Sequence, residues 1–362
     1  MMNIQKLSLR NFRNAIESDI EFSEGVNVIC GANAAGKTNI LEAIFYFAAG
    51  KSFRNCKDRE LIRFGNDKSN IAMRFLSGNN SIKMSASFSK GGRRVIKIGE
   101  SAPLKMTEYI GRFRAVIFTP DHLSLVKGSP ENRRRFLDLA ICQSFPRYAP
   151  TLSEYNRVLA QKNALLKRGN VIDELLMVYN ERLASLAAVI TVNRKKYVQK
   201  LEEEAKKFLF DMSGGKEDLT LSYQTQAGDF ETQEELREKY NNLFAEKMHS
   251  EKERFLSLYG AHKDDFVVAI NKKSARMYGS QGQQRSVVLA LKLAEGELSY
   301  KLTGEYPVFL LDDILSELDK DRKDYILSKT TGRQVIITGC ESEIFESKGN
   351  KIFVRDGVVS SI

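Results

Sequence analysis

One stretch near the N-terminus combines the residue types that bind a phosphate group. It fits the pattern G-x-x-x-x-G-K-[ST], with an apolar run before it and helix-forming residues after it. Glycine lets the backbone curl until successive N–H groups face phosphate oxygens, and the positive end of the following helix points at the same anion. The alternative is an ordinary joint between a strand and a helix. The residues of this phosphate loop are Gly31, Ala32, Asn33, Ala34, Ala35, Gly36, Lys37 and Thr38.

Four side chains in two distant stretches carry the chemistry that such a loop needs. Lys37 would reach the β- and γ-phosphates of a nucleotide, and the hydroxyl of Thr38 would bind Mg²⁺. Far downstream, the apolar run at residues 308–311 ends in Asp312 and Asp313. We expect Asp312 to hold the Mg²⁺ or its water, and Asp313 to position and deprotonate an attacking water. The alternative for both carboxylates is a turn or a helix N-cap after a buried strand.

The elements that would position the phosphate loop are strands and one helix. Alternation of apolar and polar residues predicts the strands, and residues 39–49 have the pattern of a buried helix. Glycine and asparagine turns separate three of the strands, which we expect to form a small antiparallel meander. The predicted strands are residues 4–9, 16–22, 26–29, 71–75, 82–88, 95–98 and 115–118.

The composition changes after Pro130, where helix formers dominate as far as residue 258. Residues 171–210 could hold one long helix or two. A short strand is predicted at residues 219–223, and a charged helix at residues 231–258. This part therefore reads as a largely α-helical insertion.

The C-terminal part returns to α/β character. A helix at residues 282–302 leads to the strand at 308–311, and further strands are predicted at 334–338 and 352–354. An entirely apolar strand is typical of the buried middle of a parallel sheet. We therefore predict an α/β fold whose mixed sheet carries the phosphate loop beside the antiparallel meander. The predicted domains are residues 1–125, a helical lobe at 126–258, and residues 259–362, which complete the first domain.

Composition sets outer limits on function. The 362 residues carry 56 Lys plus Arg against 46 Asp plus Glu, a net charge of +10 that favours an anionic partner such as nucleic acid or acidic lipid. We find no apolar run near the length of a membrane span and no signal-peptide core, and so expect a cytoplasmic protein with no membrane partner. The three histidines lack zinc-site spacing. The scattered cysteines, expected to be buried small hydrophobes, are Cys30, Cys56, Cys142 and Cys340.

Several motifs resemble those of one protein family. Residues 280–285, SQGQQR, resemble the signature motif of ABC-type ATPases, and residues 316–319, SELD, resemble their D-loop. The stretches at residues 7–14, 120–138 and 260–265 are similar to segments of the RecF family, a branch of the SMC-like ABC-type ATPases. The resemblance covers essentially the whole chain, and it implies an ABC-ATPase head interrupted by the helical lobe.

The resemblance implies how ATP would be used. In ABC-type ATPases two heads sandwich ATP, so Ser280, Gly282 and Gln283 would face the γ-phosphate held by the phosphate loop of a second copy. ATP would then drive formation of a homodimer, a clamp that opens on hydrolysis. Arg13 and Asn14 lie where related proteins contact nucleotide.

Two departures from the wider ABC pattern concern turnover. Asp313 stands where many ABC ATPases place Glu, so we expect a slow, DNA-stimulated ATPase. The strand at residues 334–338 is not followed by a switch histidine, and Thr338 is the candidate substitute.

The resemblance also implies a role in DNA repair. RecF proteins are expected to bind duplex DNA, gapped DNA and single-strand/double-strand junctions, and to help load recombinase with RecR and RecO. The same resemblance connects the chain to replication and the SOS response. Clustered positive side chains could neutralise DNA phosphates, although the alternative is a solvated face, and three consecutive arginines on a helix cannot all face one partner. The candidate DNA-binding residues are Arg133, Arg134, Arg135, Arg93 and Arg94.

Other classes fit less well. An SMC-type structural chromosome ATPase needs long heptad arms, which the insertion does not provide. A nucleotide-binding subunit of a transporter normally has an LSGGQ-like signature and a switch histidine. A small-molecule kinase would not need residues 280–285 or 316–319. His262 is expected to be structural rather than part of the ATP site.

Overall fold

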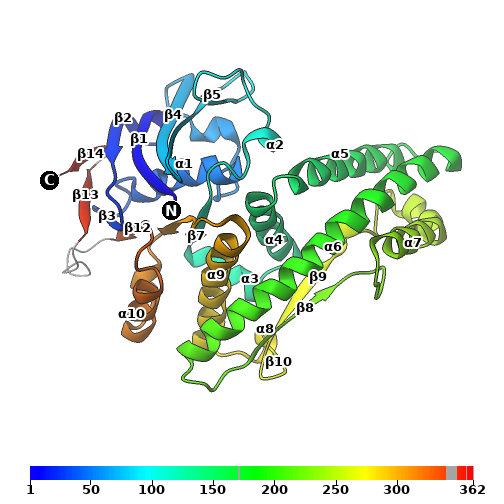
Figure 1. The fold of residues 1–362 in the computed structure, drawn as a ribbon. Helices are drawn as coiled ribbons and strands as arrows, with labels where there is room; N and C mark the ends of the chain where they lie inside the picture. Colours follow the sequence, from blue (N-terminus) through cyan, green and yellow to red (C-terminus); the bar gives the residue numbers. More distant parts are fainter. Residues whose placement is uncertain (170–171, 340–348, 356, 362) are drawn as a thin grey trace. The chain divides into compact units, whose positions relative to one another are not determined.

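The computed structural model describes residues 1–169, 172–339, 349–355 and 357–361. Cys340, which we expected to be buried, lies outside these residues. The chain forms two compact units. Unit 1 comprises Met1–His122 and Val288–Ile362, and unit 2 comprises Leu123–Val287. Unit 1 is therefore built from both ends of the chain, and its elements can be followed by colour in Figure 1.

The central sheet of unit 1 has six strands in the order β14-β13-β3-β12-β11-β7. All neighbours pair in parallel except the antiparallel pair β13 and β14. The four residues of β11 are all buried, with β12 on one side and β7 on the other, which confirms the prediction of a buried parallel strand. The bounds are β3 (Val26–Cys30), β7 (Ala115–Phe118), β11 (Val308–Leu311), β12 (Val335–Gly339), β13 (Asn350–Arg355) and β14 (Val358–Ser361).

A second, antiparallel sheet of unit 1 has the order β2-β1-β4-β5-β6. The predicted meander forms its last three strands, and β1 and β2 extend it. Alternate side chains of β4 are buried, as expected for a sheet with one face against the core. The bounds are β1 (Asn3–Phe12), β2 (Ala15–Glu21), β4 (Lys68–Ser77), β5 (Asn80–Ser89) and β6 (Val95–Ile98).

Helix α1 (Lys37–Ala49) begins in the phosphate loop and contacts β1 of one sheet and β7 and β12 of the other. This position between two sheets explains why the helix is apolar nearly all round rather than on one stripe. The helix is therefore fixed on both sides, and so is the loop that precedes it. Among the described residues, the other longer helices of unit 1 are α9 (Gln281–Thr303), which begins in unit 2, and α10 (Lys320–Lys329); α2 (Met106–Tyr109) is a single turn.

Unit 2 is largely helical, as predicted. Helix α6 is one continuous helix of 40 residues that packs against α5, α7 and β8. The predicted start of this helix at residue 171 lies outside the described residues. The helices are α3 (Ser124–Lys127), α4 (Pro130–Ser144), α5 (Tyr148–Leu166), α6 (Asp173–Met212), α7 (Gln233–Arg254) and α8 (Ala275–Tyr278), and the strands are β8 (Leu219–Gln224), β9 (Asp265–Ile270) and β10 (Lys273–Ser274).

The boundary at which the chain returns to unit 1 differs from the prediction. We expected the return at residue 259, whereas unit 2 continues to Val287. The physical reason is that β9 pairs with β8 along six residues, in the order β10-β9-β8. In addition, Arg133 of α4 binds both carboxylate oxygens of Asp265 at 2.7 and 2.8 Å. These long-range pairings hold the segment after α7 in unit 2.

Helix α6 is long and apolar enough to span a membrane by length and composition alone. No uninterrupted apolar run marks this helix in the sequence, because Glu181 and Arg182 lie within its apolar part. Half of the apolar window is buried inside the protein, against the neighbouring elements of unit 2. Such burial is typical of a core helix.

The segment at residues 260–265, one of the stretches similar to RecF, forms a polar centre in unit 2. Asp264 is 1% exposed and accepts hydrogen bonds from Thr191 and Tyr223, both at 2.7 Å. Burial raises the pKa of this carboxyl group. The ring of His262 lies 2.8 Å from the Tyr155 hydroxyl and 3.2 Å from the carbonyl oxygen of Ser257. The segment therefore serves the packing of unit 2, which agrees with a structural His262.

Candidate nucleotide-binding site

The phosphate loop joins the end of β3 to the start of α1, in the strand–loop–helix context that the motif requires. Its two glycines make close packing possible. A side chain at Gly36, where φ is +113°, would begin 2.7 Å from Asn14 Oδ1, and one at Gly31 would begin 2.3 Å from the carbonyl oxygen of Val354. Both positions therefore exclude a Cβ atom, and Gly36 also needs the left-handed backbone region.

Lys37 is folded over the phosphate loop. Its Nζ atom donates hydrogen bonds to the carbonyl oxygens of Gly31 at 2.8 Å and Ala32 at 3.1 Å. The side chain is almost fully buried, so its ammonium group is held in place by the loop itself. A phosphate bound in the loop would meet a cation that is already positioned.

The acidic strand end meets the phosphate loop because β11 and β3 flank β12 in a parallel sheet, and the carboxyl ends of all three lie at one edge. Thr38 Oγ1 donates to Asp312 Oδ1 at 2.8 Å, and Thr338 Oγ1 donates to the same oxygen at 3.0 Å. Burial raises the pKa of Asp312, while the two hydroxyl hydrogen bonds oppose this effect. The structure thus brings together the two residues predicted to hold Mg²⁺.

Asp313 lines the same site in a strained conformation. Its φ is +49°, in the left-handed region that non-glycine residues rarely adopt. The backbone N–H of Asp313 donates to Thr338 Oγ1 at 2.9 Å, and Ser316 Oγ of the D-loop segment donates to its carbonyl oxygen at 2.7 Å. The backbone of Asp313 is therefore fixed on both sides, at a position that lines the cavity of the phosphate loop.

That cavity has a volume of about 260 Å³. Most of its lining residues belong to the phosphate loop, together with Asn39 of α1 and Asp313. The remaining lining residue, Arg54, was missed by sequence reasoning. Its Nη1 atom donates to Asn39 Oδ1 at 2.9 Å, which places a second cation beside Lys37. A single arginine in the turn after α1 belongs to no motif, so only the folded structure reveals it.

Arg13 and Asn14 support the phosphate loop from behind, and neither lines the cavity. Arg13 binds both carboxylate oxygens of the buried Glu42 in α1, at 2.6 and 2.8 Å. Asn14 donates to the carbonyl oxygen of Ala35 at 2.9 Å and accepts from Asn39 at 2.8 Å. Arg13 and Asn14 therefore hold the loop and α1 in place, and their contact with a nucleotide stays a prediction.

The signature motif caps α9. Ser280 N–H donates to Gln283 Oε1 at 2.8 Å, and Gln283 N–H donates to Ser280 Oγ at 3.2 Å, which is a reciprocal capping box. Because Ser280 Oγ accepts this bond, its own proton remains available to an outside acceptor. The backbone at Gly282 lies in the first turn of the same helix. The motif thus presents a helix N-terminus with a hydroxyl, which suits a bound anion.

Most of the predicted DNA-contacting arginines are engaged within the protein. Arg133 is 6% exposed and is paired with Asp265, so the prediction that it faces DNA is not supported. Arg134 donates to the carbonyl oxygen of Asp264 at 2.8 Å, and partial burial lowers the pKa of Arg134 and of Arg135. In unit 1, Arg94 donates to the Tyr46 hydroxyl and the Gly50 carbonyl oxygen, whereas Arg93 is exposed.

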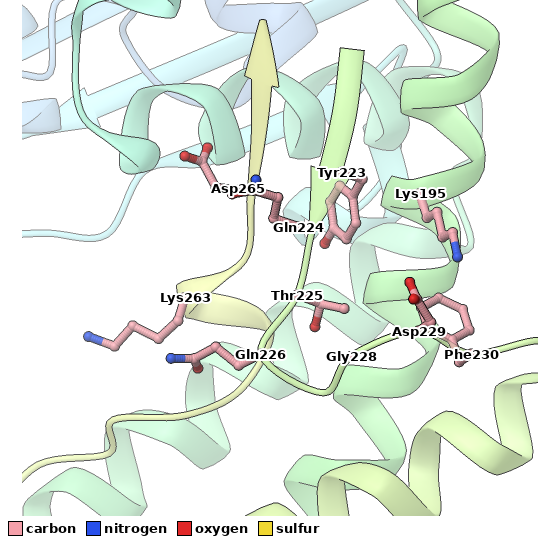
Figure 2. Close-up of a pocket in the computed structure, with 10 residues that line it drawn as sticks. All are labelled: Lys195, Tyr223, Gln224, Thr225, Gln226, Gly228, Asp229, Phe230, Lys263 and Asp265. Carbon is pink, nitrogen blue, oxygen red and sulfur yellow. The ribbon is translucent and has the colours of Figure 1, made fainter. Parts of the chain in front are cut away.

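A second cavity, of about 560 Å³, lies in unit 2 at the end of β8 (Figure 2). Lys195 lies over the ring of Phe230, with Nζ 4.2 Å from the ring centroid, and Lys263 lies across the view from it. In the part of the chain that the structure describes, neither ammonium group forms an ion pair with a carboxylate. These two cations, which no sequence run marked, are better placed for an external anion than Arg133.

The fold and the site together define the class. A phosphate loop beside an acidic strand end in a mostly parallel sheet, with a helical insertion and a serine-capped signature helix, is the head of an ABC-type ATPase. The Smc head domain from Pyrococcus furiosus shares this fold, with a TM-score of 0.58, 18% identity, and coverage of 100% of this chain and 96% of that one. This likeness confirms the predicted fold class.

Closer comparisons identify the family. Residues 3–358 match the family described as RecF/RecN/SMC N terminal domain. The chain is 38% identical over 367 residues to the DNA replication and repair protein RecF of Desulfitobacterium hafniense strain DSM 10664 / DCB-2, with 100% of both chains covered. A structure of the recombination mediator protein RecF-ATP in the RecFOR pathway has a TM-score of 0.94 and 36% identity, covering 100% of this chain and 98% of that one. The chain belongs to the RecF family.

Proposed function

We propose that this protein is an ATP-gated DNA-binding protein of recombinational repair. The observation that carries the proposal is the 2.8 Å hydrogen bond between Thr38 of the phosphate loop and Asp312 of the acidic strand end. It joins the two halves of an ATP site that lie at opposite ends of the chain. The similarity to RecF proteins, one of them named for bound ATP and the RecFOR pathway, supports the same function.

ATP binding follows from the charges around the cavity. Lys37 and Arg54 supply two cations, and the N-terminus of α1 adds its backbone N–H groups. Charged phosphate oxygens accept stronger hydrogen bonds than carbonyl oxygens. The phosphates of ATP would therefore replace the carbonyl oxygens of Gly31 and Ala32 as the acceptors of Lys37. Asn14 and Arg13 hold the loop in shape, so little reorganisation accompanies binding.

The residues present fit Mg²⁺, which prefers oxygen ligands and usually takes only one or two from protein. Thr38 and Asp312 would hold it, and the bound ion would neutralise charge on the β- and γ-phosphates. The raised pKa of Asp312 fits this role, because a buried carboxylate without a cation beside it is destabilised.

Hydrolysis is proposed to be slow. Asp313 is the candidate base, and its side chain is one methylene shorter than the Glu of many ABC ATPases, so its carboxylate would lie farther from the attacking water. Asp313 lines the cavity of the phosphate loop with its backbone in the left-handed region. We therefore infer a weak ATPase, stimulated by DNA, that resets a binding state.

The γ-phosphate is proposed to recruit a second copy of the chain. Ser280, Gly282 and Gln283 of one copy would face ATP held in the phosphate loop of the other, because the signature helix start is itself an anion site. Two such contacts close an isologous dimer around two ATP molecules. Hydrolysis removes the shared ligand and releases the clamp.

DNA is the proposed partner of the closed dimer, as duplex, gapped DNA or single-strand/double-strand junctions. Cations that form no ion pair with a carboxylate in the described residues are the preferred contacts: the exposed Arg93 in unit 1, and the exposed Lys263 and half-buried Lys195 at the cavity of unit 2. RecR and RecO are the proposed protein partners in loading recombinase, and the proposed location is the cytoplasm.

The SMC-type alternative is weaker. It needs arms of sustained heptads, whereas the helices of unit 2 fold back on one another around β8 and β9. The curated relatives that match the full length are named RecF.

Sedimentation velocity with and without ATP and Mg²⁺ tests the proposed function. The wild-type protein should shift from monomer to dimer with ATP. Lys37→Arg should abolish the shift, because the larger, planar guanidinium cannot take the place of the compact ammonium group that the loop positions. Ser280→Arg should bind ATP as a monomer without dimerising. Normal ATP-dependent dimers of either variant would contradict the sandwich.

A further inference from the structure

The short helix α8, directly before the signature motif, exposes an unusual set of side chains. Met277 is 74% exposed and Tyr278 is 69% exposed, and Arg276 beside them is exposed as well. Arginine, methionine and tyrosine are the residue types enriched in the centres of protein interfaces, and tyrosine and arginine dominate binding hot spots. Three such residues in one turn therefore mark a contact surface.

This turn is held rigidly against the signature helix. The buried Gln284 of α9 donates through Nε2 to the carbonyl oxygen of Ala275 at 2.9 Å. Ala275 is itself fully buried, and α8 packs on β9 and β10. The backbone of Gly279 passes so close that a Cβ there would lie 2.6 Å from the Ala275 carbonyl oxygen. The exposed side chains are thus presented in a fixed place, with little conformational entropy to lose on binding.

The position of the turn in the chain indicates which partner surface would contact it. Tyr278 is two residues before Ser280, so their Cα atoms are at most about 7 Å apart. Any surface that brings a phosphate to the Ser280 hydroxyl must also approach Tyr278. The signature residues Ser280, Gly282 and Gln283 are small or polar and bury little apolar area. The apolar contribution to such an interface therefore has to come from neighbouring residues.

We propose that the turn formed by Arg276, Met277 and Tyr278, named here the signature anchor, is the apolar anchor of the ATP-bound dimer, and that its partner is a second copy of this chain. This inference rests on the proposed function, because it needs the signature motif to act on ATP held by another subunit. The shared ATP supplies the charge-dependent contact, and the signature anchor supplies the hydrophobic contact beside it.

The absence of tryptophan from the whole sequence makes a direct test possible. Tyr278→Trp introduces a single tryptophan on the signature anchor. Its fluorescence is recorded, with acrylamide quenching, as ATP and Mg²⁺ are added, and the same samples are examined by sedimentation velocity. Phe255→Trp, at the exposed end of α7 in the same unit, is the matched control. We expect a blue shift and loss of quenching for Trp at 278 in the ATP-bound dimer, and no change at 255.

Truncation of the Tyr278 side chain measures its contribution to the affinity of the dimer. Tyr278→Ala should bind ATP as well as the wild type but raise the dissociation constant of the ATP-bound dimer about 30-fold, as a hot-spot residue does. Phe255→Ala should leave that constant unchanged.

The outcomes separate the two claims. A dimer that forms normally while Trp at 278 stays fully quenchable, or while Tyr278→Ala dimerises like the wild type, overturns the signature anchor and leaves the proposed function standing. Absence of any ATP-dependent dimer in the wild-type protein overturns the proposed function, and the anchor with it.

Discussion

Thr338 contacts both acidic residues of the site, the side chain of Asp312 and the backbone of Asp313. Its hydroxyl donates to Asp312 and accepts from the backbone of Asp313, both within 3.0 Å. Sequence reasoning considered this residue only as a substitute for the switch histidine of other ABC ATPases. In the structure it orients the carboxylate of Asp312, the proposed Mg²⁺ ligand, and stabilises the left-handed backbone of Asp313 beside it.

Replacement of Thr338 by valine tests this task, because valine keeps the shape and removes the hydroxyl. We expect the Mg²⁺ concentration for half-maximal ATP hydrolysis to rise about tenfold, as for other residues that orient metal ligands. A Mg²⁺ titration of ATPase activity measures it. Thr331→Val, at an exposed threonine after α10, is the control. Unchanged Mg²⁺ dependence would show that Thr338 only fills space.

The pKa of His262 makes the stability of unit 2 depend on pH. Burial lowers its pKa to about 4, whereas an unfolded chain would have a value near 6.5. Between these values the unfolded state binds a proton that the native state does not, so stability falls as the pH drops from about 6.5 toward 4. Urea unfolding at a series of pH values should show this slope in the wild type and a smaller one in His262→Gln. Equal slopes would mean that His262 does not titrate on unfolding.

At the scale of the elements, local sequence patterns predict the strands of the parallel sheet but not the pairing of strands that lie far apart in the chain. The strand at residues 308–311 and the loop motif were recognisable from local pattern, and the sheet then places Asp312 beside Thr38. The pairing of β9 with β8 depends on contacts between residues far apart in sequence, so the domain boundary at residue 259 was predicted too early. Arg54 and Lys195 each line a cavity only because tertiary folding brings them there, and no sequence motif or residue spacing predicts their positions.

Helix α4 shows why a run of charges is a poor guide to a binding surface. The guanidinium of Arg133 binds the Asp265 carboxylate at the start of β9 instead of a DNA phosphate. Removing one partner of a buried ion pair leaves the other charge uncompensated. Arg133→Ala should therefore destabilise the protein by about 3–5 kcal/mol in urea unfolding.

The control for this prediction is Arg93→Ala, whose exposed side chain should leave the unfolding free energy nearly unchanged. The double variant Arg133→Met with Asp265→Leu should recover much of the loss, since both charges are then removed. A stable Arg133→Ala protein with weakened DNA binding would restore the original DNA-contact prediction.

At the scale of the whole molecule, both ends of the chain are needed for one ATP site, and the signature motif belongs to the inserted unit. The net charge of +10 would double in the proposed dimer, so an ATP-bound dimer would present twice the positive charge to one DNA. In the proposed clamp, ATP would control DNA affinity through assembly, and hydrolysis would reverse it.

Binding to gapped duplex DNA, measured against salt concentration with and without ATP, tests this central claim most directly. We predict that ATP strengthens binding and steepens its salt dependence, because the dimer releases more counterions than the monomer. Lys37→Arg should show neither change. Equal affinity and equal salt dependence with and without ATP in the wild-type protein would contradict the ATP-gated clamp and leave an ordinary basic surface.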